Sequence, residues 1–231
     1  MTMNIRTVAA CAFAITIAGE RVDAQDLARY RTFELGTSVA TVSAVTGVAS
    51  SEARTIHQRP ALLQNLEWRP SQWRVGSVTE STDPVDRVVF SFHNDRLFQI
   101  VVDYGHDRTE GMTDADMIEA ISAAYGPASK ARSSAGVQSQ VDIESGTPVA
   151  RWADPTHAVV LYRTSSYRGV YRLIVTDAVV ANLARKDAAQ AVRLDDQQAP
   201  QREIARQKKE RDDARAVADK ARNANKGQFI P

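Results

Sequence analysis

The stretch DRVVFSFHNDRLFQIVVDY, residues 86–104, decides the fold. Two runs rich in β-branched and aromatic residues flank Asn94 and Asp95, residue types that tolerate the left-handed backbone of a tight hairpin turn. We therefore predict a β-hairpin. Alternation about that turn places one set of apolar residues on the first face (Val88, Phe90, Phe92, Leu97 and Val101) and another on the second (Val89, Phe98, Ile100 and Val102). Because both faces are apolar, we expect the hairpin in the middle of a sheet, under a further layer.

Two helices are indicated on either side of this hairpin. Downstream, Thr113 and Asp116 form a capping-box pattern, an apolar stripe at helical spacing follows, and Gly126 with Pro127 ends the segment. Upstream, Ser38 can cap a helix that ends at Gly47. The valines and threonines between them are poor helix formers, so a strand is the alternative over residues 38–47.

The segment IHQRPALLQNLEWRP, residues 56–70, carries the polar residues that first suggest a site. Its apolar residues alternate well enough for a strand, with Pro60 at a bend or an edge. On a strand, Glu67 and Arg69 point to one side and Trp68 to the other. A solvent-exposed ion pair on a half-buried strand is therefore the simplest interpretation of the two charges.

Three further strand-like runs fall within residues 141–177, and they complete an apparent repeat. The order helix, tryptophan strand, hairpin occurs twice, with EWRP before the first hairpin and RWADP before the second. We predict an α+β fold of two related helix-plus-antiparallel-sheet units in tandem, residues 25–110 and 111–199. The second unit ends in a docking helix with Val180, Leu183 and Ala184 on one side. A charged helical or disordered tail, residues 200–231, follows, and we expect Pro200 to break the helical run.

The first 24 residues resemble a cleavable secretory signal. Arg6 precedes an apolar run, and Val22-Asp23-Ala24 stands before Gln25. The run is too short to span a membrane, and no later segment is apolar enough. We expect an exported chain, periplasmic or extracellular, that begins near Gln25. The only cysteine, Cys11, lies inside the signal, which excludes disulfides and cysteine ligands from the mature chain.

Charge is distributed unevenly along the chain. Residues 25–178 contain 15 Lys and Arg against 18 Asp and Glu, whereas residues 179–231 contain 12 against 8. The acidic body argues against nucleic acid as a partner.

The motifs of common enzyme classes are missing from the sequence: G-x-S-x-G, H-E-x-x-H, a phosphate loop and a dinucleotide fingerprint. The four histidines show no metal-ligand spacing, and the loop at residues 105–111 lacks the EF-hand pattern, so we predict no metal and no cofactor. Asp114 and Asp116 suit a helix N-terminus better than a calcium site.

Parts of the chain resemble known families. YRTFELG (Tyr30 to Gly36), IHQRPA (Ile56 to Ala61), LEWRP (Leu66 to Pro70) and GMTDADMIEAISAAYG (Gly111 to Gly126) resemble a group of uncharacterised exported proteins of Gram-negative bacteria. The order of elements is similar to the small α/β domain of the outer-membrane-assembly lipoproteins and, when doubled, to the tandem β-lactamase-inhibitor-protein fold. The resemblance implies export and a binding or scaffolding role. The chain departs from those families because it has no credible lipid-bearing cysteine and no cysteine in the mature part.

Together these observations favour a non-catalytic binding or assembly module whose partner is an envelope protein or polymer. Its candidate binding residues are His57, Arg59, Glu67, Trp68 and Arg69. The alternative is a hydrolase of an envelope polymer that uses one of two triplets, His57, Glu67 and Arg69 or His106, Asp107 and Glu110. The sequence does not define an oligomeric state.

Deleting residues 200–231 should leave the thermal midpoint of the mature chain nearly unchanged. These residues bury too little apolar surface to offset the ordering entropy, which is roughly 1 to 2 kcal/mol per residue for the backbone alone. Calorimetry on the full and the shortened chain measures the difference, and we expect any loss in salt-sensitive binding to envelope fractions instead. A drop of many degrees would show that the tail packs on the sheet.

Overall fold

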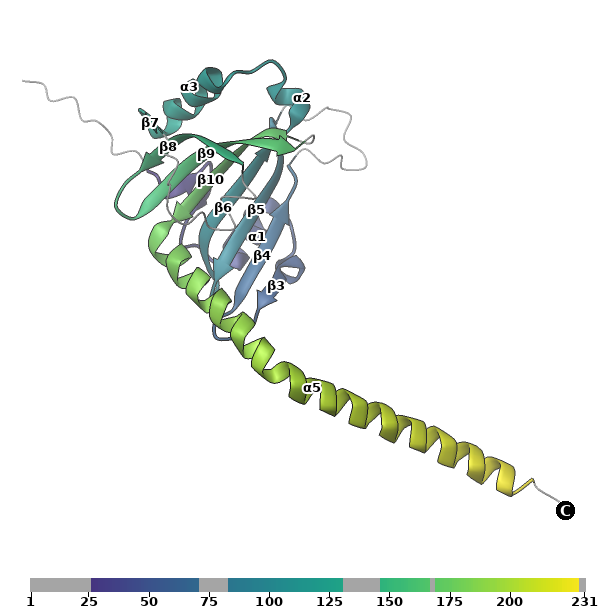
Figure 1. Cartoon of the computed structure of the whole chain (residues 1–231). Coiled ribbons are helices and arrows are strands. Elements are labelled where there is room, and N and C mark those ends of the chain that lie inside the picture. The colour runs from purple at the N-terminus through teal and green to yellow at the C-terminus, as the bar shows by residue number, and fades with distance from the viewer. Residues whose placement is uncertain (1–25, 71–82, 131–145, 167–168, 229–231) are drawn as a thin grey trace, which may run out of the picture.

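The computed structural model describes residues 26–70, 83–130, 146–166 and 169–228. The predicted signal, residues 1–24, lies outside them. Eight strands form one antiparallel sheet: β3 (Arg54–His57), β4 (Leu63–Trp68), β5 (Val85–His93), β6 (Arg96–Tyr104), β7 (Ser129–Lys130), β8 (Thr147–Ala153), β9 (His157–Ser166) and β10 (Gly169–Asp177). The helices are α1 (Val39–Thr46), the 3-10 turn η1 (Ser50–Glu52), α2 (His106–Thr109), α3 (Asp114–Tyr125) and α5 (Ala178–Lys226). The α+β prediction is confirmed (Figure 1).

The strand order in the sheet is β3-β4-β5-β6-β10-β9-β8-β7. Four consecutive strands after α1 form one meander, and four after α3 form a second. The meanders join through their last strands, with Leu173 of β10 opposite Val102 of β6. Trp68 and Trp152 both lie on the second strand of a meander, and each pairs with a valine of the third, Val88 and Val159. The two outermost strands are short, which limits the unpaired edges of the sheet.

Strands β5 and β6 form the predicted hairpin at the predicted turn. Asn94 and Asp95 both adopt positive φ, 48° and 63°. The predicted sharing of faces was wrong for part of β6. A register shift near Phe98 pairs Ser91 with Gln99 but Phe92 with Leu97. Ile100 and Val102 therefore lie on the same face of the sheet as Phe90, and Val101 lies on the opposite face. A bulge inserts one residue, and that residue reverses the alternation beyond it.

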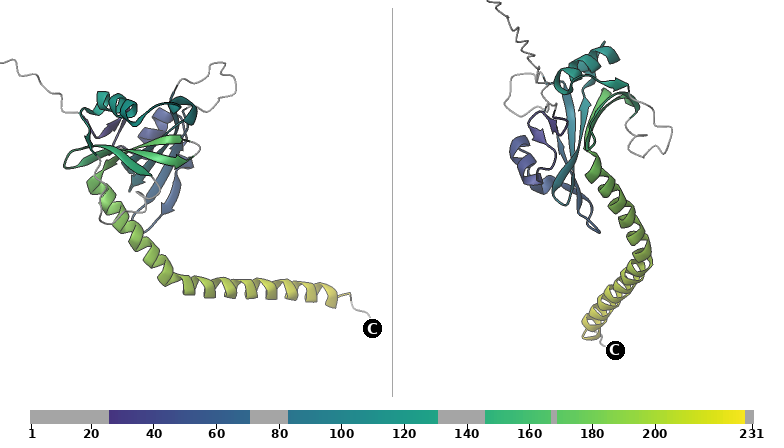
Figure 2. Two further views of the ribbon diagram at one scale, coloured as in Figure 1. Left: turned by 45° about the horizontal axis from the view of Figure 1, so that its top comes forward. Right: turned by 90° about the vertical axis from the view of Figure 1, so that its left-hand side faces the viewer.

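The first face of the sheet forms the core. Its fully buried side chains include Phe90, Phe92, Ile100 and Leu173, and helices α1 and α3 cover it together with a small hairpin of β1 (Arg29–Tyr30) and β2 (Phe33–Glu34). Figure 2 (right) shows this hairpin and α1 on one side of the sheet and the start of α5 on the other.

The caps of α1 and α3 follow the sequence prediction. The Ser38 side chain accepts from the Thr41 N–H, and Gly47 ends α1 with a φ of 72°, so the helix, rather than the strand, forms over residues 38–47. Thr113 and Asp116 form the predicted capping box of α3, and Gly126 follows its end. Capping is thus a sufficient role for Asp116.

Two predicted elements differ from the structure. The segment at residues 56–70 is not one strand but two, because β3 and β4 form a hairpin whose connection contains Pro60. A proline has no N–H for a ladder, so it suits this connection. Residues 106–109 form the short helix α2 rather than a loop. The Thr109 hydroxyl donates to the Gly105 carbonyl within that turn.

Helix α5 spans 49 residues, and the prediction that Pro200 breaks it was wrong. A proline removes one backbone hydrogen bond, to the residue four positions earlier, and it bends a helix more readily than it ends one. The helix changes direction along its course (Figure 2, left). Val180, Ala181, Ala184 and Ala191 are buried, but Leu183 is 48% exposed, so its predicted docking was wrong. Every residue from 199 to 228 is exposed.

No helix in the described part of the chain is both long and apolar enough to cross a bilayer. Even the long α5 is rich in charged side chains.

The β5–β6 turn forms hydrogen bonds with three other parts of the molecule: α5, the β3–β4 hairpin and α1. His93 Nε2 lies 2.7 Å from Asp187 Oδ2 of α5. The Asn94 N–H donates to the Leu62 carbonyl, and its Oδ1 accepts from the Leu62 N–H. Asp95 Oδ1 accepts from the Val39 N–H at the start of α1. Arg96 Nη2 donates to Asp177, the cap of α5. Residues 93–96 therefore fix α1, α5 and the β3–β4 hairpin relative to the central strands.

Asn94 adopts a left-handed backbone conformation, and its side chain accepts the hydrogen bond from the Leu62 N–H. Two substitutions separate these roles. Asn94→Gly keeps a residue suited to positive φ and loses only the acceptor for Leu62, so it should lower the free energy of unfolding by about 1 kcal/mol. Asn94→Ala loses both and should cost about 2 kcal/mol. Urea denaturation of the two variants and of a Gln201→Ala control measures this. Equal losses for glycine and alanine would contradict a role for the left-handed backbone.

Candidate functional site

A cleft of about 200 Å³ lies between the β3–β4 hairpin and α5. The hairpin lines it with residues 56–59, and α5 lines it with Ala191, Leu194, Asp195 and Arg202. In Figure 1, α5 leaves β10 and runs past the end of the sheet where β3 and β4 turn. We call this feature the α5 cleft. It contains two of the predicted binding residues, His57 and Arg59.

Two guanidinium groups converge on one oxygen at the α5 cleft. Arg59 Nη2 donates to Gln198 Oε1 at 2.9 Å, and Arg202 Nη2 donates to the same atom at 3.0 Å. Arg202 Nη2 also lies 3.0 Å from Asp195 Oδ1. Arg59 forms no salt bridge with any residue that the structure describes. Among the described residues, Arg59 is therefore a cation in the cleft whose hydrogen-bond partner is a neutral amide.

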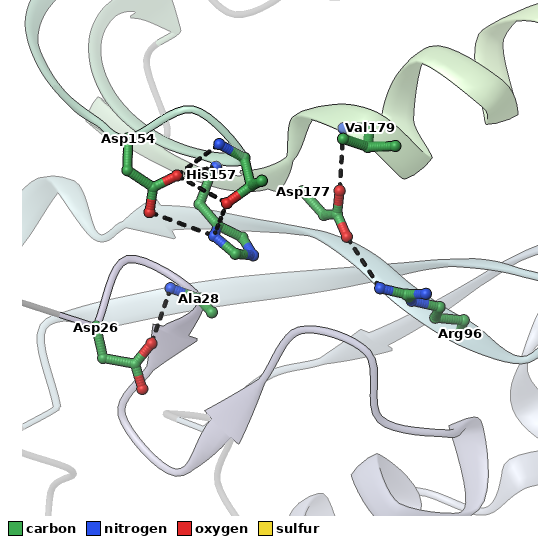
Figure 3. Close-up of polar contacts among 8 residues, drawn as sticks. Asp26, Ala28, Arg96, Asp154, His157, Asp177 and Val179 are labelled. Carbon is green, nitrogen blue, oxygen red and sulfur yellow. Dashed lines mark hydrogen bonds and ion pairs between the residues drawn. The ribbon is translucent and has the colours of Figure 1, made fainter.

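Helix α5 forms one wall of the cleft, and its direction is set at its N-cap, Asp177. Asp177 Oδ1 accepts from the N–H groups of Val179 and Val180, both at 3.0 Å. Arg96 binds the other carboxylate oxygen at 3.2 Å, and Figure 3 shows the contacts of Asp177 with Val179 and Arg96. The Ala178 N–H donates to the Thr156 carbonyl of the β8–β9 turn. These bonds and the burial of Asp177 set the direction in which α5 starts.

The β8–β9 turn beside this start is itself built around Asp154 (Figure 3). Its Oδ1 accepts from the N–H groups of Thr156 and His157, both at 2.6 Å. Burial acts to raise the pKa of Asp154, but these hydrogen bonds outweigh it and lower the pKa to about 2. Asp154 and His157 thus have a structural role in the turn.

The other three predicted binding residues lie at the far end of β4. His57 pairs with Leu63 at the start of this strand, and Glu67 is four residues further on, about 13 Å at strand spacing. Glu67 Oε1 accepts from Arg69 Nε at 2.7 Å, as the strand geometry predicts. Trp68 packs edge-on against Phe33, with ring centroids 5.5 Å apart. Trp68 therefore contributes to the core, and the triplet His57, Glu67 and Arg69 is not assembled.

The second triplet lies on α2 and at its end. His106, Asp107 and Glu110 are all exposed, and none of them lines the α5 cleft. Nearby Asp114 accepts hydrogen bonds from Arg163 and from the Tyr171 hydroxyl, which hold the start of α3 against β9 and β10. Over the described ranges, no three His, Cys, Asp or Glu side chains are grouped as a metal ion would need.

A second charged cluster lies on the other face of the central strands. Asp103 accepts from Arg87 Nη2 at 2.6 Å and from Arg172 Nε at 2.6 Å, directly across β5, β6 and β10. Burial acts to raise the pKa of Asp103, but the hydrogen bonds from Arg172 and Arg87 outweigh it, so the pKa is lowered. Because the Asp103 carboxylate accepts hydrogen bonds from both guanidinium groups across the junction of the meanders, we assign this cluster a structural role.

The half of the cleft that α5 supplies was not predicted from the sequence. Asp195, Gln198 and Arg202 belong to a long charged run in which nothing marks them from their neighbours. Arg59 and Gln198 are 139 positions apart. Only the path of α5 beside the hairpin brings them together.

The sequence matches no protein-family model. It also matches no curated protein. Among solved structures, it is similar to a cysteine-rich secretory protein from Staphylococcus aureus subsp. aureus Mu50, at 10% identity and a TM-score of 0.31. The match covers 64% of this chain and 44% of that chain, so this chain spans less than half the length of that protein. Similarity of this extent assigns neither a fold nor a function.

Asp103→Asn should make the protein less stable at neutral pH. Hydrogen bonds to a charged group are worth roughly 1.5 to 3 kcal/mol. In the variant one arginine keeps only a neutral acceptor, and the other faces an amide NH2 group that cannot accept its hydrogen bond. Because the folded pKa of Asp103 is lowered, its contribution is present above the ordinary pKa of an aspartate and is lost as the pH falls through the folded value. Denaturation curves of the wild type and the variant should therefore differ at neutral pH and converge at acidic pH.

A matched variant tests this assignment. Asp212→Asn removes a carboxylate from the exposed part of α5 and should change stability little at either pH. If Asp103→Asn behaved like Asp212→Asn, the cluster would not hold the two meanders together.

Proposed function

We propose that this protein is an exported, non-catalytic binding module and that it binds its partner at the α5 cleft. The observation that carries the proposal is the convergence of Arg59 and Arg202 on a neutral oxygen in a concave, solvent-open position. A cleft with a few convergent polar groups is the usual form of a ligand site. The signal-like first 24 residues support export.

The outer part of α5 supports an assembly role within this proposal. Beyond Arg202, residues 203–226 form about 36 Å of helix in which every residue is exposed. Ion pairs within the helix, such as Arg206 with Glu203 and Glu210, favour it without tertiary packing. A helix of this kind can hold a body at a set distance from a surface or from a second partner.

The repeated order of elements supports a duplicated origin for the fold. Each meander follows a helix, and the tryptophans Trp68 and Trp152 occupy matching strands. We propose that the chain is two related units in tandem and that it belongs with the exported proteins of Gram-negative bacteria that it resembles. The hydrolase alternative gains no support from the site, because the α5 cleft includes His57 without Glu67 or Arg69.

Retention of envelope components by the immobilised mature chain, residues 25–231, tests the proposal. The wild type should retain a component of a Gram-negative envelope extract, and Arg59→Ala should reduce that retention about tenfold, because a charged contact is lost. Arg54→Ala is the matched control, since Arg54 is exposed on the same hairpin but does not line the cleft.

Two results would contradict the proposal. One is that nothing is retained by the wild type at several salt concentrations. The other is retention that Arg59→Ala and Arg54→Ala change equally.

A further inference from the structure

We propose that the α5 cleft binds the carboxylate of a small polar ligand, with Arg59 and Arg202 as its anchors. This inference rests on the proposed binding function and specifies the chemistry of the ligand.

The positions of the two guanidinium groups define where the anion sits. Both donate to Gln198 Oε1, at 2.9 Å and 3.0 Å. Each guanidinium has five N–H donors in a planar fork, so one shared amide oxygen uses a small part of their capacity. A carboxylate oxygen at that point would replace a neutral acceptor with a charged one, and charge-assisted hydrogen bonds are about twice as strong.

The charge of the lining favours a monoanion. Two guanidinium groups, from Arg59 and Arg202, and one carboxylate, from Asp195, leave a formal charge of one positive unit when His57 is neutral. A single carboxylate neutralises this charge. A phosphate dianion would exceed it and would meet the Asp195 carboxylate, which lies 3.0 Å from Arg202.

The size and lining of the cleft favour one end group of a ligand. About 200 Å³ is smaller than the roughly 300 to 1,000 Å³ of pockets that enclose a drug-sized molecule. His57 and Gln58 offer hydrogen-bonding groups beside the arginines, so hydroxyl or amide groups next to the carboxylate would find partners. An acidic sugar and the carboxyl end of a polar peptide both have this chemistry.

Binding of this kind would also join two parts of the chain. Arg59 belongs to the β3–β4 hairpin, whereas Gln198 and Arg202 belong to α5. A carboxylate held by both arginines connects the hairpin to α5 directly, in place of the amide of Gln198. The ligand should therefore hold the start of the exposed part of α5 against the body.

Titration of the mature chain, residues 25–231, with glucuronate tests the proposal. NMR signals of the arginine Nε–H groups report binding, glucose is the neutral comparison, and inorganic phosphate is the competing anion. Glucuronate should shift the Arg59 and Arg202 signals saturably, glucose should not, and phosphate should bind more weakly. The same titration with an N-acetylated dipeptide shows whether the carboxylate of a peptide binds more tightly than the carboxylate of a sugar acid.

Variants identify the site of binding. Arg59→Gln should weaken glucuronate binding about tenfold, and the control Arg54→Gln should leave it unchanged. Gln198→Ala removes the competing amide and should retain or strengthen binding. Thermal midpoints of all three variants should match the wild type, because these side chains are exposed or half-buried.

Several outcomes would overturn the proposal. These are no saturable glucuronate binding, binding unaffected by Arg59→Gln, tighter binding of phosphate, or a loss in Gln198→Ala as large as that in Arg59→Gln. If glucuronate binding fails but an envelope component is still retained in an Arg59-dependent way, the proposed binding function stands. Only the proposal that the ligand is a carboxylate is then rejected.

Discussion

The tight turn between β5 and β6 is the constraint on which the rest of the structure depends. Its backbone needs two consecutive left-handed residues, and Asn94 and Asp95 supply them. The side chains of residues 93–96 then bind α5, the β3–β4 hairpin, α1 and the cap of α5 in turn. A hairpin is local in sequence, so it forms without distant contacts, and each neighbour adds to it through a specific hydrogen bond. The buried His93 shows the strength of this constraint, since a buried polar group without its partner is costly.

The second constraint is the junction of the two meanders. Each meander alone would leave its last strand as an unpaired edge, and pairing β6 with β10 removes both edges from the centre of the sheet. Asp103 bridges Arg87 and Arg172 across this junction. The edges that remain, β3 and β7, have four and two residues, too few for an extended template. The two meanders therefore form one continuous sheet, and the α5 cleft forms where α5 passes the β3–β4 hairpin at one end of that sheet.

The α5 cleft depends on the same anchors. Asp177 and Asp187 set the start and the course of α5, and the Asn94 bonds set the hairpin that faces it. The position of Arg202 opposite Arg59 is thus a consequence of contacts made elsewhere on the sheet. A ligand bound to both arginines would therefore influence the orientation of the exposed part of α5. Every residue of that part from 199 to 228 is exposed.

The sequence by itself determined the features that local physics controls. Residue pattern and capping chemistry sufficed for the α+β class, the turn at Asn94 and Asp95, both capped helices and the pairing of Glu67 with Arg69. Only the tertiary structure decided the rest. A one-residue bulge near Phe98 reversed the faces of β6, and α5 continued through Pro200. Arg202 joined Arg59 in a cleft that neither predicted triplet forms. The reason is that faces, helix paths and clefts depend on pairings between residues far apart in the chain, and a charged residue shows no local sign of which distant partner it will meet.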